Sequence, residues 1–297
     1  MLVAAEHLGS VGVGVTKSQF FRANDGKVYI VKLKNNIFGP KVLVSEFLAA
    51  AFGRIMNLCF PPSGVIALDE QTLRQSRRLI GSGASPGQHF ASEYLAGAEY
   101  VRPDNLGKAV NITEMAGVML FDHMFHNPDR AQNKKNLLLR QEDAGFRIYA
   151  IDNSHLFKSG RWTRAALDAL SAKLRIYYHY SFGLLLRDRL SPPDFLPYLD
   201  KVAKLGNEQI DSLVRAVPEK WLPADAPERE ALARFIKIRR DMAEDIWDKL
   251  CKHIPKARGG HRRLPGRVIR LAGKAKLQDG AAAGRAVGAC RKIGGRG

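Results

Sequence analysis

The sequence predicts an α+β fold in which a strand-rich N-terminal part with one helix precedes a mostly helical half. Short apolar runs separated by turn residues fill much of the first 97 residues, as is typical of strands. One stretch in this part, 41–56, instead has apolar residues at helical spacing. Helical spacing dominates after residue 157. Strands followed by helices, without regular alternation, indicate the α+β class.

A β-hairpin is predicted near the N-terminus. Asn24-Asp25-Gly26 lies between the apolar segments 19–22 and 27–33, and such a turn sequence favours a tight hairpin. The preceding run, 9–18, contains glycine at regular intervals and is expected to be a further β-like segment. We therefore expect residues 9–34 to form strands.

Lys32 is placed on an apolar face of the second hairpin strand. Alternate side chains of a strand point to the same side, so Lys32 lies beside Val28 and Ile30. The helix predicted at 41–56 follows and carries Glu46 near its beginning. A lysine on a strand and a carboxylate on the next helix are suitably spaced to form an ion pair.

The remainder of the N-terminal part is predicted to contain two more strands, at 64–68 and 89–95, with an irregular segment at 69–88 between them. Ala96-Gly97-Ala98 follows the last of these strands. Small and flexible residues at this point favour a boundary between two lobes. We expect an N-lobe over residues 1–97 and a C-lobe over residues 98–255.

The centre of the chain, 121–157, concentrates the polar side chains best suited to chemistry. A helix that begins at Asn111, with Glu114 three residues later as in a capping box, runs towards it. Asp129 then lies in a polar loop, Asn136 precedes an apolar strand, and Asp152 ends the next one. Two acids and an amide at the mouths of two strands can orient a hydroxyl group and hold Mg²⁺ against phosphate oxygens.

The second half of the C-lobe is predicted to be helical from its apolar period. The sequence shows no internal repeat. The expected helices are 163–174, 184–189, 193–204, 208–214 and a long one at 228–251.

The net charge of +18 is concentrated at the C-terminus. Residues 256–297 contain twelve Lys or Arg and a single acid, Asp279. This segment is rich in Gly and Ala and lacks an apolar period, so it is expected to be a disordered basic tail. Weak contact with nucleic acid is the most that such a tail predicts, because aromatic residues for base stacking are missing.

Cysteine use and hydropathy predict a cytoplasmic protein that does not bind a membrane. The three cysteines are odd in number and far apart, which does not indicate a disulfide framework. The N-terminus lacks a basic leader region, and the longest apolar stretch, 47–60, is short and contains Arg54.

Other catalytic and metal sites are weakly represented. His123 and His126 precede Asp129 with a spacing that a metal site could use, but helix-end hydrogen bonding is the simpler interpretation. The nucleophile-elbow, phosphate-loop and zinc-protease motifs are missing from the sequence. Taken singly, Asn127-Pro128-Asp129 could be an ordinary turn and Asp152-Asn153-Ser154 an Asx turn.

Together, these residues match the requirements of phosphoryl transfer. A lysine held by a carboxylate can neutralise phosphate oxygens, which assigns that pair of roles to Lys32 and Glu46. Asp129 could accept the proton of a substrate hydroxyl or orient that group. Asn136 and Asp152 offer the hard oxygen ligands that Mg²⁺ prefers.

The same segments resemble the HipA-like kinases, whose protein-kinase-like fold is related to that of the phosphoinositide kinases. The resemblance covers about residues 9–160. It implies a bilobal fold, ATP and Mg²⁺ as cofactors, catalytic residues Asp129 and Arg130, and metal ligands Asn136 and Asp152. It further implies nucleotide contacts from Lys32 and Glu46, and from a hinge at Glu93, Tyr94 and Leu95. The segments that carry it are Tyr29-Ile30-Val31-Lys32, Ser45-Glu46-Phe47-Leu48, Asn127-Pro128-Asp129-Arg130, Asn136-Leu137-Leu138 and Ile151-Asp152-Asn153-Ser154.

Two departures from the usual kinase pattern leave alternatives open. The amide expected five positions after Asp129 is replaced by Lys134, with Asn133 and Asn136 on either side; Asn136 is favoured because it directly precedes the apolar strand. The run 9–18 is not a regular glycine loop.

The expected function is transfer of a phosphoryl group from ATP to a Ser or Thr of a protein or of the chain itself. The alternative is a pseudokinase-like regulatory or toxin-type module, and either could have an antitoxin-like partner.

Overall fold

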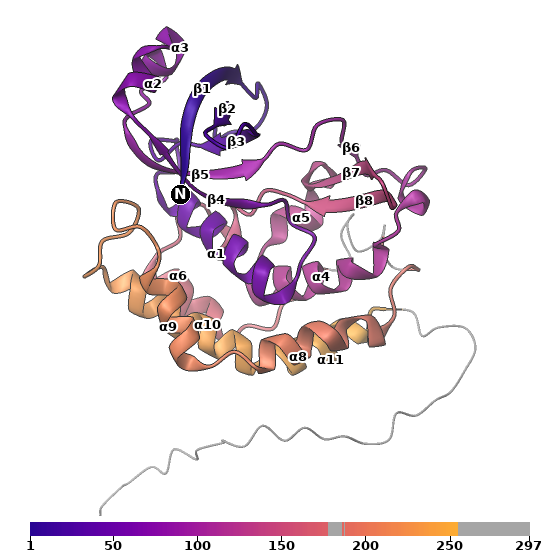
Figure 1. Ribbon diagram of the computed structural model, residues 1–297. Helices are drawn as coiled ribbons and strands as arrows, with labels where there is room; N and C mark the ends of the chain where they lie inside the picture. Colours follow the sequence, from indigo (N-terminus) through magenta and orange to yellow (C-terminus); the bar gives the residue numbers. More distant parts are fainter. Residues whose placement is uncertain (178–185, 187, 255–297) are drawn as a thin grey trace, which may run out of the picture. The chain divides into compact units, whose positions relative to one another are not determined.

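The computed structural model describes residues 1–177, 186 and 188–254 (Figure 1). The described residues belong to one compact unit. The predicted basic tail and half of the helix expected at 184–189 (residues 184, 185 and 187) lie outside the described residues. The expected boundary between lobes at residue 97 stays a prediction.

A closed barrel of five strands forms the N-terminal part, in the order β1-β2-β3-β5-β4. All neighbouring strands are antiparallel except β1 and β4, which pair in parallel and close the barrel. The strands are β1 (Leu2–Ser10), β2 (Gln19–Ala23), β3 (Val28–Lys32), β4 (Ser63–Leu68) and β5 (Gly87–Glu93).

The barrel interior is filled by small and aromatic apolar side chains. Phe21, Tyr29 and Val31 are buried there in one cluster. Because alternate residues of β3 point to opposite sides, Lys32 leaves the barrel on the other face, as the sequence predicts. The lysine is thereby directed away from the barrel core and towards the following helix.

The expectation of a strand at 9–18 was wrong: this segment is largely a loop, and the strand lies earlier, in β1. Gly12 and Gly14 have φ values of 76° and 85°, which an extended strand does not use and which glycine adopts most readily. The loop is closed by a hydrogen bond from the Val11 amide to the Ser18 carbonyl at 2.9 Å. It joins two barrel strands with its backbone exposed at Gly12 and Gly14.

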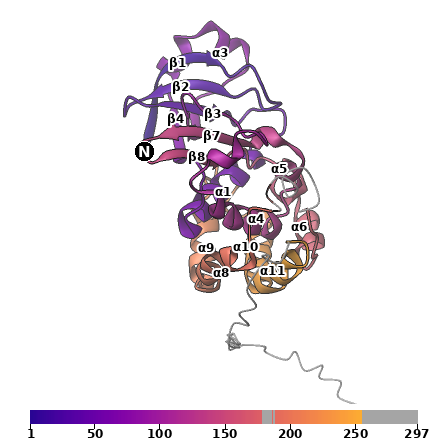
Figure 2. The ribbon, with the colours of Figure 1, turned by 90° about the vertical axis from the view of Figure 1, so that its right-hand side faces the viewer.

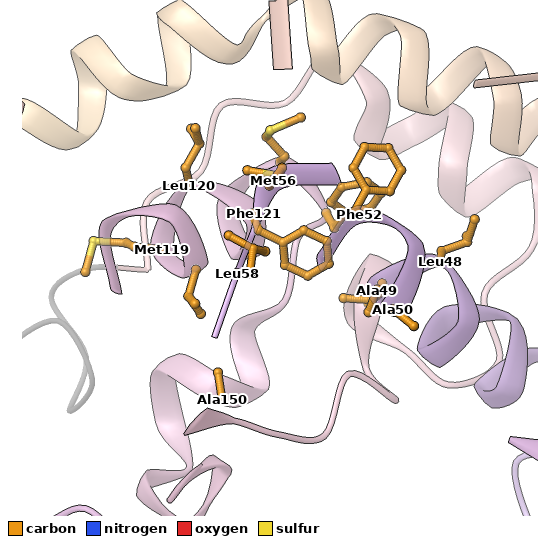
Figure 3. Packing of buried hydrophobic residues seen from close by; sticks show 14 of the residues in the cluster. Leu48, Ala49, Ala50, Phe52, Met56, Leu58, Met119, Leu120, Phe121 and Ala150 are labelled. Atoms are coloured by element: carbon orange, nitrogen blue, oxygen red, sulfur yellow. The ribbon is translucent and has the colours of Figure 1, made fainter. Parts of the chain in front are cut away.

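The helix α1 (Lys41–Met56) has the predicted bounds and ends at Asn57, which adopts a left-handed conformation with φ 56°. It packs against α4 (Met115–Met124), and both helices belong to the main apolar core (Figure 3). The rings of Phe52 on α1 and Phe121 on α4 lie 6.5 Å apart between centroids. This core fixes the helix of the N-terminal part to the helix that precedes the central polar loop.

A second, three-stranded sheet in the order β6-β7-β8 lies between the barrel and the C-terminal helices (Figures 1 and 2). Its strands are β6 (Glu99–Tyr100), β7 (Leu137–Glu142) and β8 (Gly145–Ala150), close to the two strands predicted after Asn136 and before Asp152. Leu139 and Ile148 pair across β7 and β8 and are buried in the main core. The opposite face of the sheet is less buried.

The C-terminal helices pack below α1 and α4 in Figure 1. The helix expected at 228–251 is broken at Met242, whose φ and ψ of −92° and 3° are not helical, into α10 and α11. The described helices of this part are α6 (Arg164–Ser171), α8 (Leu196–Ala203), α9 (Asn207–Arg215), α10 (Pro227–Asp241) and α11 (Ala243–Cys251), with 3₁₀ turns η4 (Leu156–Lys158) and η5 (Pro192–Phe195).

Two further expectations differ in detail from the structure. The segment expected to be irregular contains two short helices, α2 (Glu70–Arg74) and α3 (Arg77–Gly81), each capped by a side chain. The helix expected to begin at Asn111 starts instead with a 3₁₀ turn, η2 (Ile112–Glu114). The Asn111 side chain does not cap it but bonds to the backbone of Ile148 on β8. A second 3₁₀ turn, η1 (Leu106–Lys108), precedes it.

His89 on β5 is buried as a neutral imidazole. Its Nδ1 accepts from the Lys34 amide at 3.0 Å, and its Nε2 donates to the Ser85 carbonyl at 3.0 Å. Burial lowers the pKa of His89 to about 4, because the charged form would be desolvated. The unfolded chain therefore binds more protons than the folded chain between about pH 4 and the ordinary histidine pKa near 6.5.

We expect His89→Gln to reduce the acid sensitivity of the fold. A group whose folded pKa is depressed contributes stability above its unfolded pKa and loses it as pH falls, here by on the order of 1 kcal/mol per pH unit between about pH 6 and 4. Urea unfolding at pH 7 and pH 5 measures this loss in both proteins. An unchanged difference between the two pH values in the variant would contradict the assignment.

Candidate active site

A buried ion cluster joins the barrel, α1 and the segment after β8. The Lys32 ammonium donates to a carboxylate oxygen of Glu46, to Asp152 Oδ1 at 2.8 Å and to Ser154 Oγ at 2.6 Å. Glu46 is only 4% exposed and accepts in addition from the Asn153 amide at 3.0 Å and from the Ser154 hydroxyl at 3.0 Å. Five residues from three segments of the chain thus share one set of hydrogen bonds.

The charges of Lys32 and Asp152 stabilise each other. Burial alone would raise the pKa of Asp152, but the Lys32 ammonium and the Ser154 hydrogen bonds hold it well below its usual range. Burial would likewise lower the pKa of Lys32, but the carboxylates of Asp152 and Glu46 raise it above its usual range. Both groups are therefore charged at neutral pH. The Asp152 side chain is still 39% exposed, so it faces the surface of the site.

Asp152 lies at a backbone position that directs its side chain. Its φ of 59° is in the left-handed region, which few non-glycine residues adopt. The Ser154 amide donates to Asp152 Oδ1 at 3.2 Å, so the Asx turn considered for this segment is present. Asp152 Oδ1 therefore accepts hydrogen bonds both from the Ser154 amide of the turn and from the Lys32 ammonium.

The second carboxylate of the centre, Asp129, is joined directly to Asn136. Asp129 lies in the short helix α5 (Pro128–Gln132), and Asn136 ends the 3₁₀ turn η3 (Lys134–Asn136). Asn136 Nδ2 donates to Asp129 Oδ2 at 2.6 Å, and Asn133 Nδ2 donates to Asn136 Oδ1 at 3.3 Å. Both amides that the sequence left open therefore lie beside Asp129, with Asn136 in direct contact.

Asn136 also connects the two halves of the centre through its backbone. Its carbonyl accepts from the Ile151 amide at 3.0 Å, and Asp152 is the next residue. The residues Asp129, Asn136 and Asp152 are therefore brought together at one end of the β7–β8 sheet, beside Lys32. This is the arrangement that the sequence predicts.

Arg130 is fully buried beneath these residues. Its guanidinium donates to the Ile151 carbonyl at 2.5 Å, to the Asn136 carbonyl at 3.3 Å and to Asn153 Oδ1 at 2.5 Å. Its Nε donates to Asp122 Oδ2 at 2.8 Å. Each of these contacts holds backbone or side-chain atoms of the loops, so Arg130 faces the interior rather than the open side of the site.

Asp122 on α4 forms a buried ion pair with Arg130. Burial raises the pKa of Asp122 to about 6, while the Arg130 charge and hydrogen bonds from Arg130 and Asn127 act in the opposite direction. Asn127 Nδ2 donates to Asp122 Oδ1 at 2.9 Å, and the Asn127 amide donates to the Asp122 carbonyl at 2.8 Å. The loop that carries Asp129 is thus fastened to the end of α4.

The three hinge residues predicted to contact a nucleotide differ in their exposure and in their hydrogen bonds. The Glu93 carboxylate forms an ion pair with Lys27 at 2.8 Å, and the amides of Glu93 and Tyr94 donate to carbonyls of neighbouring segments. The Tyr94 ring is 41% exposed and lies 5.0 Å from the ring of Phe20. Leu95 is buried, and within the part of the chain described here its amide has no such hydrogen bond.

The sequence did not identify three residues that the site uses. Ser154 and Asn153 bond to Lys32, Glu46 and Arg130, and Asp122 pairs with Arg130. The first two directly follow Asp152, so their position beside a predicted ligand was the available signal. Asp122 is a single acid within the apolar helix α4, where an unpaired carboxylate would be costly; that was a second signal.

The donor set fits a hard divalent cation supported by a phosphate ligand. Asp129, Asn136 and Asp152 offer carboxylate and amide oxygens, and the partly exposed Asp152 side chain lies at the surface of the site. Among the described residues, no group of three or more His, Cys, Asp or Glu could hold a metal ion by itself. A hard divalent cation can be held by one or two carboxylates together with waters and substrate phosphates.

The barrel, the Lys32–Glu46 pair and the acidic residues at the mouth of β7 and β8 define a protein with a kinase-like fold. The HipA-like kinase family matches residues 6–250, and the chain belongs to that family. The match extends beyond the segments that carry the resemblance in the sequence and includes most of the C-terminal helices.

A solved structure with a TM-score above 0.5 shows the same fold at low sequence identity. The Helicobacter pylori proinflammatory kinase CtkA is 12% identical, with a TM-score of 0.51 over 81% of this chain and 93% of that chain. Hydra Fam20 with sugar is 12% identical, with a TM-score of 0.46 over 84% and 88% of the two chains. The Golgi casein kinase with Mn/ADP bound is 10% identical, with a TM-score of 0.46 over 84% and 73%.

Two further findings are negative. No curated protein matches the chain. In the described ranges, no helix has the length and apolar character needed to span a membrane.

We expect Lys32→Met to destabilise the fold by about 3 kcal/mol, because it leaves the buried Glu46 carboxylate without its partner. Adding Glu46→Gln should restore much of this loss, since the uncompensated buried charge is then removed. Urea unfolding of the two single variants and the double variant gives the coupling free energy directly. Additive losses in the double variant would show that the pair is not coupled.

Proposed function

We propose that this chain is an ATP- and Mg²⁺-dependent phosphotransferase whose acceptor is a Ser or Thr hydroxyl, on another protein or on the chain itself. The observation that carries the proposal is the joining of Lys32, Asp152, Asn136 and Asp129 at one end of the β7–β8 sheet. Membership of the HipA-like kinase family supports the same activity. Phosphoryl transfer demands positioning and charge neutralisation rather than covalent help from the protein, and this site offers both.

Each side chain has a role that follows from its position. Lys32, held by Glu46, neutralises phosphate oxygens of the nucleotide. Asp129, which Asn136 fixes at 2.6 Å, orients the acceptor hydroxyl and accepts its proton. Asn136 and Asp152 would hold Mg²⁺, which would neutralise charge on the phosphates. In the hinge, the Leu95 amide is the donor that we assign to the nucleotide base.

Arg130 is better described as a positioning residue than as a catalytic one. Its guanidinium is buried and bonds to the carbonyls of Asn136 and Ile151, the residues at the two strand mouths. It therefore fixes the distance between the segment of Asn136 and that of Asp152. A group in this place acts on the reaction through the residues that it holds.

The roles of the two acids are separable by experiment. Asp129→Ala is expected to lower kcat at least about 100-fold while Mg²⁺-ATP binding stays within about threefold, because this residue acts on the acceptor. Asp152→Asn is expected to weaken Mg²⁺-ATP binding at least about tenfold, because a metal ligand is lost. Transfer from γ-labelled ATP and nucleotide titration measure the two effects.

The matched control is Asp245→Asn, which removes an exposed carboxylate on α11 and should leave both quantities unchanged. Full turnover in both site variants would refute the assignments. Mg²⁺-ATP binding by wild type without any transfer would instead favour a pseudokinase-like regulatory module. The lengthened loop between Asp129 and Asn136 and the irregular glycine run at 9–18 are the features that motivate this alternative.

For Arg130, we expect Arg130→Lys to lower kcat by about tenfold or more and to lower the melting temperature, because one ammonium cannot replace the planar guanidinium at several acceptors. Asp122→Asn removes only the counter-charge and should have the smaller effect on kcat. A positioning role predicts that nucleotide affinity and kcat both change in Arg130→Lys. A variant that melts earlier but retains wild-type kinetics would show a role in folding alone.

A further inference from the structure

Three basic side chains form an uncompensated cluster on the surface. Lys173 and Arg175 are exposed, and Lys158 is partly exposed. Partial burial lowers the pKa of Lys158, and the positive charges of Arg175 and Lys173 lower it further. The three side chains, called the basic cluster below, are therefore close enough to repel one another.

Lys158 is fixed beside the loop that carries Asp129. Phe157 and Lys158 both adopt left-handed conformations, with φ values of 57° and 66°. Their amides donate to the carbonyls of Phe125 at 2.8 Å and His126 at 3.0 Å. Asp129 follows His126 by three positions, so Lys158 is held next to the segment that leads to the proposed acceptor site.

Hydrogen bonds to backbone carbonyls also fix the segment that carries Lys173. The fully buried Arg239 donates to the carbonyls of Lys173 at 2.7 Å and Ser171 at 3.2 Å. The His126 ring donates through Nε2 to the Leu170 carbonyl at 3.1 Å. The backbone that supports the basic cluster is thus bonded directly to the loop before Asp129.

No carboxylate balances these charges in the described part of the chain. The segment 155–177 contains five Lys or Arg and one acid, Asp168, which pairs with Arg234 at 2.7 Å. No ion pair joins Lys158, Lys173 or Arg175 to a described Asp or Glu. The sequence of the residues outside the described ranges contributes only one further acidic side chain, Asp279.

We propose that the basic cluster binds acidic residues of the acceptor protein, so that the preferred phosphorylation site is a Ser or Thr flanked by Asp or Glu. The inference rests on the proposed phosphotransferase function and adds the class of acceptor. An acidic polypeptide is favoured over nucleic acid because the backbone of Lys158 is bonded to His126, in the segment that leads to Asp129. Among the described residues, the aromatic side chains of Trp162 and Tyr177 are buried, so these two offer no surface for base stacking.

The test uses three peptides that differ only in the residues flanking one Ser: Glu, Gln or Lys. With the full chain and γ-labelled ATP, kcat/KM for the Glu peptide is expected to exceed that for the Gln peptide by about tenfold, since the preference comes from a few exposed charge pairs. The preference should shrink at high salt. Lys173→Glu combined with Arg175→Glu should remove or reverse the preference, mainly through KM.

The matched control is Arg77→Glu combined with Arg78→Glu, which makes the same change in charge on exposed positions of α3. The melting temperatures of both double variants report whether they are folded. Equal use of the three peptides by wild type, or a Glu preference that survives Lys173→Glu/Arg175→Glu, overturns the proposal. Loss of binding to single-stranded DNA in that variant with peptide preference unchanged would assign the cluster to nucleic acid, and also overturns it.

Peptide binding separates this inference from the proposed function. Fluorescence anisotropy of the labelled Glu and Lys peptides, with Mg²⁺ and a non-hydrolysable ATP analogue present, does not require turnover. Tighter binding of the Glu peptide that is lost in Lys173→Glu/Arg175→Glu supports the basic cluster even if no phosphate is transferred. Absence of transfer to every peptide, by contrast, counts against the phosphotransferase.

Discussion

The arrangement of the site depends on one buried ion cluster. Lys32 and Asp152 are separated by 120 positions in the chain, yet the ammonium and the carboxylate are 2.8 Å apart. An unpaired charge at this depth would be costly, so the Lys32 ammonium requires the carboxylates of Glu46 and Asp152 beside it. The barrel, α1 and the segment after β8 are therefore held together by the same groups that the proposed reaction uses. In such a site, catalytic competence and local stability are linked.

The apolar core links the ion cluster to the segment that carries Asp129. Phe52 of α1 packs on Phe125 with ring centroids 4.8 Å apart, and Phe121 of α4 lies 4.7 Å from Phe125. Glu46 projects from α1, and the loop of Asp129 follows directly after Phe125. Helix packing thus fixes the position of the carboxylate that holds Lys32 relative to the proposed acceptor site. Close-packed side chains leave little room for one helix to move without the other.

The sequence predicted those parts of the fold that short-range patterns determine. The bounds of α1 follow from the apolar period, and the strands before Asp152 and after Asn136 follow from apolar runs next to polar residues. The closure of the barrel by parallel pairing of β1 and β4 was not predictable in this way, since it depends on contacts between distant segments. The glycine-rich loop was misjudged because alternating Gly and Val suits both an extended strand and a loop with positive φ.

For the site, the sequence predicted which residues lie close together but not which ones face inward. Asp129, Asn136, Asp152 and Lys32 were expected together, and the structure places them together. Arg130 directly follows Asp129, and no local pattern distinguishes a guanidinium that faces a substrate from one that faces carbonyls. That distinction depends on Asp122 and Asn153, which are near Arg130 only after the chain has folded.

Two buried arginines bind backbone carbonyls of the segments around Asp129. Arg130 holds the carbonyls of Asn136 and Ile151, while Arg239 holds those of His123 at 2.8 Å and Met124 at 2.9 Å, at the end of α4. Burial lowers the pKa of Arg239 to about 10, which still leaves it charged at neutral pH. Carbonyls at the end of a helix have no partners within that helix, and a guanidinium offers five donors in a fixed plane. A segment fastened on both sides in this way can present Asp129 in a fixed position while its open side remains free to admit an acceptor.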